Sequence, residues 1–84
     1  RQDDADWEGV DRELFEALRL RRKELADLAK APPYVIANDA TLRALARMRP
    51  SNDDELLLVP GIGAKKAERY GAELLAVIAA HAAA

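Results

Sequence analysis

Two glycines one residue apart stand at the centre of the stretch Leu57-Leu58-Val59-Pro60-Gly61-Ile62-Gly63-Ala64-Lys65-Lys66-Ala67. Glycine adopts backbone angles that other residues avoid, so residues 60–63 are predicted to form a tight hairpin. A helix is expected to begin directly afterwards, at Ala64, with two lysines in its first turn. The stretch therefore predicts a helix, a hairpin and a second helix in close succession.

The composition of the whole chain favours helices over strands. Half of its 84 residues are hydrophobic, and they include 18 Ala and 12 Leu, whereas Val, Ile and Thr together number only 8. Unbranched side chains lose little rotamer freedom in a helix, while β-branched ones lose more. A chain of this length forms at most one domain. We therefore expect one all-α domain over residues 10–81.

The first helix is expected to begin near Asp11, whose side chain can cap the free amides of the first turn. Apolar residues then recur at three-and-four spacing as far as Ala29. The Pro-Pro pair at 32–33 ends this helix, because proline lacks an amide donor and pushes the preceding residue towards extended geometry. The Tyr-Val-Ile run at 34–36 is predicted to follow as an extended apolar connector.

Two short helices are expected before the hairpin. Asn38 or Asp39 caps the first of them, which Pro50 ends. Ser51 with Asp54 resembles a capping box, so the second is predicted to begin at Ser51.

The last helix is expected to run from Ala64 to about Ala80. Gly71 is predicted to bend it into two segments, and residues 82–84 to fray.

Charge is distributed unevenly along the chain, although the formal net charge is only −2. Residues 1–18 sum to −5, residues 19–50 to +5 and residues 51–84 to −2. Residues 1–9 are predicted to be the acidic end of a linker. Trp7 within them is expected to dock ahead of the first helix, the alternative being a role in binding. Such segregation suggests patches that meet a charged partner, although helical surfaces also segregate charge without one.

The inventory of side chains argues against an enzyme. The chain has no Cys and only one His, one Ser and one Thr, so most nucleophilic and acid–base constellations lack a member. We expect no catalytic residue, no metal site and no cofactor, and no membrane span, because the longest apolar run, 74–80, is far below the roughly 18 residues needed. With Arg at position 1, the chain is expected to be a piece of a longer intracellular protein.

The hairpin stretch resembles a helix-hairpin-helix element. In such elements the free amides at the start of the second helix face a nucleic-acid phosphate, and nearby lysines add charge. The alternative is that the glycines only permit a tight turn and Ile62 fills the core.

A wider set of motifs resembles the HRDC domain, named for helicase and RNase D C-terminal. The motifs follow one another in the order of that family, from about Val10 to His81: Leu14-Phe15, Leu18-Arg19-x-x-Arg22, Pro32-Pro33-Tyr34-Val35-Ile36, Asn38-Asp39-Ala40-Thr41-Leu42, Val59-Pro60-Gly61-Ile62-Gly63 and Glu68-Arg69-Tyr70-Gly71. The likeness is to the version in RecQ-type DNA helicases, with an RNase D-like nuclease as the second choice of parent. It implies a compact bundle of about five helices that modulates DNA binding and substrate choice, while ATP is used elsewhere in the parent.

The resemblance also implies where DNA is bound. Family members that bind single-stranded DNA combine an aromatic residue of the Pro-Pro-Tyr connector with basic residues on adjoining helices. In this chain these are Tyr34 with Lys65 and Lys66, and further Arg43 or Arg69. An aromatic ring stacks on any base, and ammonium groups displace counterions from phosphates. The alternatives are a half-buried Tyr34 that reaches water and an Arg69 that pairs with Glu73.

An acidic run departs from a simple DNA-binding surface. Asp53, Asp54 and Glu55 precede the hairpin, and carboxylates repel phosphates, so we expect weak binding of single-stranded or branched DNA. The second hypothesis is a protein-interaction module, in which this run contacts a basic surface of another domain of the helicase. A metal site is the less favoured use of these acids, because consecutive helical carboxylates splay apart. A monomer acting on DNA in the bacterial cytoplasm is expected.

Overall fold

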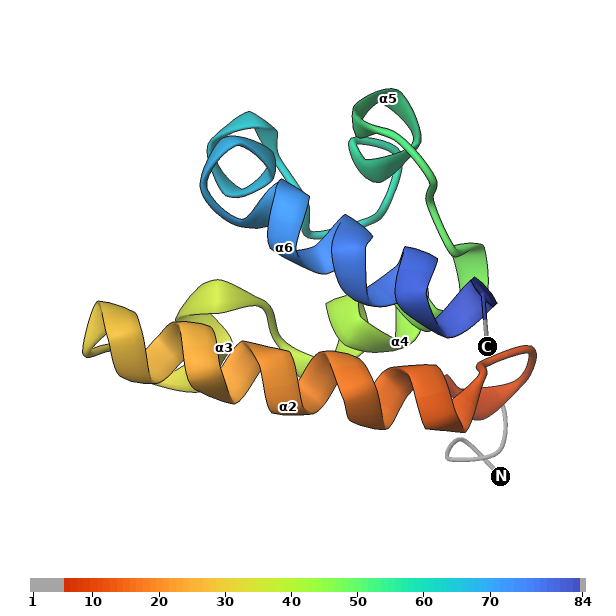
Figure 1. Cartoon of the computed structure of the whole chain (residues 1–84), viewed down its shortest axis with the longest axis horizontal. Coiled ribbons are helices and arrows are strands. Elements are labelled where there is room, and N and C mark those ends of the chain that lie inside the picture. Colours follow the sequence, from red (N-terminus) through yellow and green to blue (C-terminus); the bar gives the residue numbers. More distant parts are fainter. Residues whose placement is uncertain (1–5, 84) are drawn as a thin grey trace.

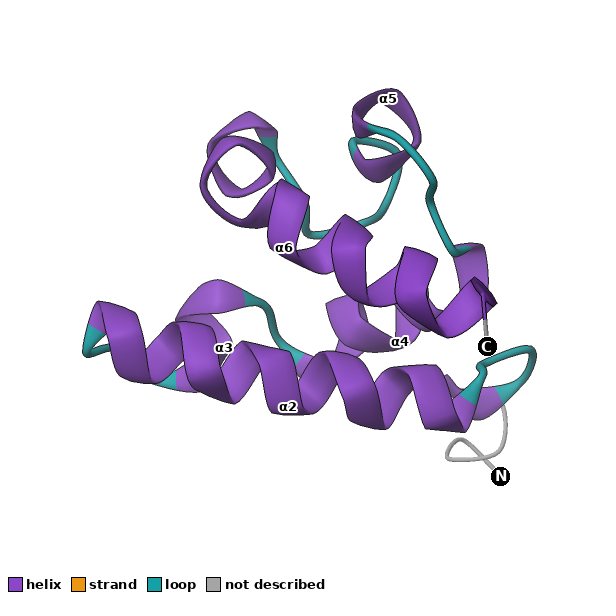
Figure 2. Cartoon of the chain, viewed as in Figure 1, coloured by secondary structure: helices purple, strands orange, loops and turns teal. Residues whose placement is uncertain are grey.

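A long amphipathic helix, α2, forms one side of the molecule and carries most of the contacts between elements (Figure 1). The computed structural model describes residues 6–83, and within them five helices have defined bounds and no residue is in a strand (Figure 2). α2 spans Arg12–Ala29, and Asp11 caps it by accepting a hydrogen bond from the Leu14 amide at 3.1 Å. Lys30 ends it in the left-handed conformation, with φ 54°.

The connector predicted to be extended is helical, which corrects that expectation. α3 spans Pro33–Ile36, with proline in its first turn and Pro32 as its N-cap. Proline lacks the amide donor that a first-turn residue leaves unsatisfied in any case, and its fixed φ already suits a helix. Ile36 is fully buried, and its burial holds the turn in place.

α4 spans Asp39–Met48 and is capped by Asn38, whose side-chain oxygen accepts a hydrogen bond from the Thr41 amide at 2.8 Å. Of the two residues predicted as alternative caps, Asn38 is therefore the one used. Leu42 and Leu45 are fully buried against α2, and Arg49 ends the helix with φ 48°.

The predicted start of the next helix was wrong by two residues. α5 spans Asp53–Leu56, and its cap is Asn52, which accepts a hydrogen bond from the Glu55 amide at 2.9 Å. The reciprocal half of the cap runs from Glu55 to Ser51, whose amide and hydroxyl both donate to Oε1 at 2.8 and 3.0 Å. Asp54 makes no such bond in the described residues, because the register of the cap is set by Asn52.

α6 spans Ala64–Ala83 and crosses α2 (Figure 1). Its helical hydrogen bonding is continuous, and the ribbon changes direction near residue 70, in agreement with a bend at Gly71. Gly71 is also buried against α5, because a Cβ there would lie 3.0 Å from Leu56 Cδ2. Residues 82–84 were predicted to fray, but α6 continues through residue 83. Ala84 lies outside the described residues. Residues 1–5 of the predicted linker end also lie outside them.

Two groups of buried residues hold the helices together. The larger joins α2, α4, α5, the hairpin and α6, and it includes Leu14, Leu18, Leu42, Leu45, Leu56 and Leu74. The smaller consists of Leu25, Ala26 and Ile36, where α3 meets the end of α2. Tyr70 is partly buried, packs against both groups and so joins them. The predicted all-α bundle with its hairpin between helices is confirmed.

Candidate nucleic-acid interface

The hairpin between α5 and α6 is fixed to the core by two apolar residues. Val59 is 1% exposed and Ile62 5%, so Ile62 fills the core, as the alternative interpretation of this stretch states. Gly61 between them has φ 92°, a conformation that favours glycine. A Cβ on Gly61 would overlap Thr41 Oγ1 and lie 3.3 Å from Thr41 Cβ. The hairpin therefore rests directly on the first turn of α4, and only a glycine permits that approach.

The start of α6 presents free amides and two lysines. Gly63 precedes the helix, and its carbonyl accepts the first helical hydrogen bond from the Ala67 amide at 2.9 Å. A Ser, Thr, Asp or Asn at this position caps the next amides with its side-chain oxygen. Glycine has no side chain, so these amides are not capped by it. Lys65 is exposed and Lys66 half-buried in this turn. The turn therefore combines amide donors with two positive charges, an arrangement that suits an anion.

Tyr34 projects from α3 as an exposed side chain. Its side chain is 68% exposed although Ile36, two residues later, is fully buried. Tyr70 of α6 packs against the group of Leu25, Ala26 and Ile36, where α3 meets the end of α2. Lys66 lies one turn before Tyr70 on the same side of α6. Tyr34 and Lys66 therefore belong to neighbouring elements, and we call Tyr34, Lys65, Lys66 and Arg69 the hairpin face.

The two predicted arginines lie in different places. Arg69 is exposed on α6 one turn after Lys65, and the predicted pair with Glu73 does not form, because Glu73 binds Arg21 of α2. Arg43 lies elsewhere, with its guanidinium carbon 5.6 Å from the centre of the Trp7 ring. Thr41 contacts the hairpin, and a residue two positions later on a helix points roughly 200° away. The structure thus groups Arg69 with the lysines and separates Arg43 from them.

The acidic run forms an exposed edge on α5. Asp53, Asp54 and Glu55 are all exposed, and among the described residues no group of three acids, histidines or cysteines is arranged to hold a metal ion. The amide of Ser51, and then its hydroxyl, donate hydrogen bonds to Glu55 and hold the pKa of its carboxyl below the usual value. After the buried Leu56, Leu57 and Leu58 are 47% and 73% exposed. The sequence analysis missed this apolar pair, although a single turn cannot bury four consecutive apolar residues, which is the signal that could have found it.

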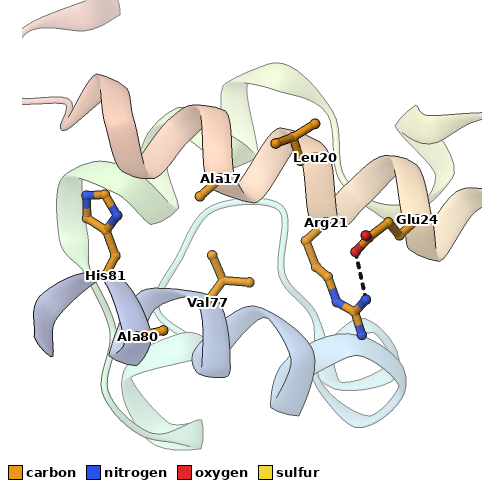
Figure 3. Close-up of a pocket in the computed structure, with 7 residues that line it drawn as sticks. All are labelled: Ala17, Leu20, Arg21, Glu24, Val77, Ala80 and His81. Atoms are coloured by element: carbon orange, nitrogen blue, oxygen red, sulfur yellow. Dashed lines mark hydrogen bonds and ion pairs between the residues drawn. The ribbon is translucent and has the colours of Figure 1, made fainter. Parts of the chain in front are cut away.

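A shallow apolar groove of about 420 Å³ lies between α2 and the C-terminal half of α6. Figure 3 shows Arg21 with Glu24 at one end and His81 at the other, with Ala17, Leu20, Val77 and Ala80 between them. Side-chain hydrogen bonds with Glu24 and then Glu73 raise the pKa of Arg21. His81 Nε2 lies 3.6 Å from Asp11 Oδ2 and joins the end of α6 to the cap of α2. The polar groups of the groove thus connect the helices.

The sequence of this chain matches a known domain family and resembles parts of known helicases. The family model of the HRDC domain matches residues 11–78, so the chain belongs to the HRDC domain family. It is similar to the ATP-dependent DNA helicase RecQ of Haemophilus influenzae, with 42% identity over 73 residues, covering 87% of this chain and 12% of that protein. RecQ of Bacillus subtilis is 46% identical over 70 residues, covering 83% of this chain and 12% of that protein.

A second kind of helicase and one solved structure extend the comparison. The ATP-dependent DNA helicase UvrD2 of Mycobacterium tuberculosis is 41% identical over 69 residues, covering 82% of this chain and 10% of that protein. The solved D. radiodurans RecQ HRDC domain 3 is 43% identical with a TM-score of 0.76, covering 77% of this chain and 86% of that one. The chain thus spans about a tenth of the length of these helicases.

No helix within residues 6–83 is long and apolar enough to cross a membrane.

Proposed function

We propose that this domain is a non-catalytic accessory module of a RecQ-type ATP-dependent DNA helicase, and that its hairpin face binds single-stranded DNA weakly. The observation that carries the proposal is Tyr34, a 68% exposed aromatic ring held on a one-turn helix by the buried Ile36 beside it. Exposing a large ring from an anchored turn costs hydrophobic stabilisation that burial would provide. Stacking of the Tyr34 ring on a nucleobase would provide that stabilisation instead.

The lysines and amides of α6 supply the electrostatic part of binding. Lys65, Lys66 and Arg69 surround the start of the helix, where backbone amides are free to bind phosphate oxygens. Neutralising about three phosphates of a single strand gives a slope of log affinity against log salt of only about −2. The face therefore binds without base specificity, and weakly at physiological salt. The ATP-driven motor belongs to other domains of the parent, which acts on DNA in the bacterial cytoplasm, while this domain modulates its choice of DNA structure as a monomer.

Fluorescence anisotropy with a labelled single-stranded oligonucleotide tests this proposal at low and at physiological salt. Tyr34→Ala is expected to weaken binding by about 1–3 kcal/mol, the usual contribution of one stacked base. Val35→Ala is the matched control, because Val35 is 44% exposed on the same turn and has no ring. Lys66→Ala is expected to make the salt slope shallower by about 0.7, whereas Lys23→Ala, on α2, leaves it unchanged. An absence of binding at low salt would refute the proposal.

A second function is favoured by the apolar pair beside the acids. Leu57 and Leu58 are exposed one residue after the run Asp53, Asp54 and Glu55, so this edge suits a partner surface that is basic and partly apolar. Another domain of the parent helicase is the partner we propose for it. Asp54→Lys then alters DNA affinity in the full-length enzyme and leaves the isolated domain unaffected. Glu13→Lys, a change to another exposed first-turn carboxylate, is the control that should be silent in both.

A further inference from the structure

One arginine of α4 donates two hydrogen bonds to the segment before α2. Arg47 donates from Nε to the Glu8 carbonyl oxygen at 3.0 Å and from Nη2 to the Asp6 carbonyl oxygen at 2.9 Å. Gly9 turns the chain with φ 75°, and the Val10 amide bonds the Trp7 carbonyl oxygen at 3.0 Å. We call Asp6 to Val10 the N-terminal arm. It is folded back on the domain as an ordered turn.

Trp7 of the arm is inserted between two further arginines. The guanidinium carbon of Arg12 lies 4.2 Å from the centre of the indole ring, and that of Arg43 lies 5.6 Å from it. The ring also meets Phe15 edge-on, with the two ring centres 4.7 Å apart. The predicted docking of Trp7 ahead of the first helix is therefore confirmed. The ring therefore lies near two guanidinium groups and one aromatic ring.

Arg12, Arg43 and Arg47 thus meet at the arm, and we call these three residues the arm face. Arg43 and Arg47 are one turn apart on α4, while Arg12 opens α2. This face is distinct from the hairpin face, because Thr41 directs the opposite side of α4 towards Gly61. The molecule therefore carries two separate groups of basic side chains.

The contacts that the arm makes are those of a short piece of single-stranded nucleic acid. A flat aromatic ring lies against guanidinium groups, as a base does when it stacks on arginine. Two oxygen acceptors, the carbonyls of Asp6 and Glu8, bind one guanidinium fork, as phosphate oxygens do. These acceptors carry only partial charge, and arginine binds a fully charged phosphate more strongly. A nucleic-acid strand therefore has the groups needed to replace the arm.

We propose that the arm face is a second binding surface for single-stranded nucleic acid. Its arginines, of which Arg12 and Arg47 are exposed, stay bound to the N-terminal arm until a strand displaces it. This goes beyond the function proposed above, because it uses different residues on another side of α4. Affinity for a strand at this face is reduced by the fraction of molecules in which the arm is open. Loss of the arm contact then strengthens binding, the opposite of what loss of a binding residue does.

Releasing the arm is the first test, with anisotropy on a labelled single-stranded oligonucleotide. Trp7→Ala is expected to tighten binding several-fold and to steepen the salt slope by about 2, since three arginines become available to phosphates. Adding Arg43→Ala and Arg47→Ala removes the gain. The matched control adds Arg19→Ala and Lys23→Ala to Trp7→Ala instead. These two exposed basic residues have the same spacing on α2, and the control variant is expected to keep the gain in affinity. Unchanged or weaker binding by a folded Trp7→Ala variant would overturn the proposal.

The unmodified chain provides a second test that does not depend on the folding of a variant. Trp7 is the only tryptophan of the sequence, so its fluorescence reports the arm alone. Saturating oligonucleotide is expected to shift its emission to the red as the indole enters water. An unchanged emission, or a shift with polyglutamate and none with the oligonucleotide, refutes the proposal. Repeating the titration with Tyr34→Ala separates the two faces, because the emission shift persists even if the hairpin face proves inactive.

Discussion

The hairpin face and the arm face differ in what their basic side chains contact. On the hairpin face Lys65 and Arg69 extend from α6 as exposed side chains, and Tyr34 is exposed beside them. On the arm face Arg47 grips two backbone carbonyls, and an indole ring lies between Arg43 and Arg12. Lysine is a hydrated point charge, whereas the planar guanidinium of arginine binds acceptors in pairs and stacks on rings. The difference teaches that an exposed basic residue can already be bound by the chain itself, as Arg47 is, so exposure alone does not identify a free binding group.

The largest expected effect comes from removing the anchor of the hairpin face. Ile36→Ala deletes a fully buried side chain between α2, α3 and α6 and is expected to lower the free energy of unfolding by about 2–5 kcal/mol. Urea denaturation followed by circular dichroism measures the change. Val35→Ala on the same turn should cost less than about 0.5 kcal/mol if exposure decides the outcome. Trp7 emission below the transition should stay native, and a shift there would mean that the two faces are not independent.

A smaller effect is expected where the hairpin rests on α4. Gly61→Ala forces an alanine into a left-handed conformation, at about 1–3 kcal/mol, and its Cβ also clashes with the buried Thr41. Gly63→Ala is the control, because its Cβ meets nothing within 4 Å and its φ is not positive. Thermal unfolding of both variants checks the difference. Equal loss in the two would contradict close contact between the hairpin and Thr41.

The cap of α4 affects both faces at once, because this helix supports the hairpin with Thr41 and the arm with Arg43 and Arg47. Asn38→Ala removes the acceptor of the Thr41 amide and is expected to cost about 1 kcal/mol of stability. Asn38→Asp, which keeps an acceptor, should restore nearly all of it. Equilibrium unfolding measures the loss, and amide hydrogen exchange at Thr41 locates it. Protection of Thr41 that survives in the alanine variant would argue against this cap.

The smallest expected effect is a pH dependence at the acidic edge. Hydrogen bonds from Ser51 lower the pKa of Glu55 below its usual 4.5, so its charged form stabilises the folded state. That contribution is present in full above the unfolded pKa and is lost as the pH falls through the folded value. Glu55→Gln should therefore be less stable than the wild type near neutrality, with the difference closing in acid. A difference that grows as the pH falls would reverse this assignment, and an NMR titration of Glu55 gives its pKa directly.

Local sequence signals were sufficient for most of the secondary structure. Asp11 and Asn38 were predictable as caps because a short polar side chain before an apolar stripe satisfies free amides in any fold. The hairpin followed from Gly61, since few residues adopt its φ. The turn at α3 was not predicted, because the Pro-Pro pair is equally suited to an extended chain or to a first helical turn. Burial of Ile36 beside Leu25 and Tyr70 determined which of them formed.

The candidate site was only partly predictable for the same reason. Tyr34, Lys65 and Lys66 were identified from motifs, and the structure brings their elements together through Tyr70. Arg43 was assigned with them from its charge alone, yet the direction of a helical side chain depends on which face the core takes. The roles of Arg12 and Arg47 were missed, since Arg47 binds residues about forty positions earlier in the chain. No local pattern encodes a contact of that separation.

The sequence by itself determined the all-α class, the helix caps, the hairpin and, through its motifs, the resemblance to the HRDC family. Each of these depends on backbone preferences and apolar spacing within a few residues, which act alike in any surroundings. The tertiary structure alone decided which side of α4 meets the hairpin, that Tyr34 stays exposed while Ile36 is buried, and that the arm contacts three arginines. These outcomes depend on packing between distant segments, where the burial of one residue fixes the direction of its neighbours.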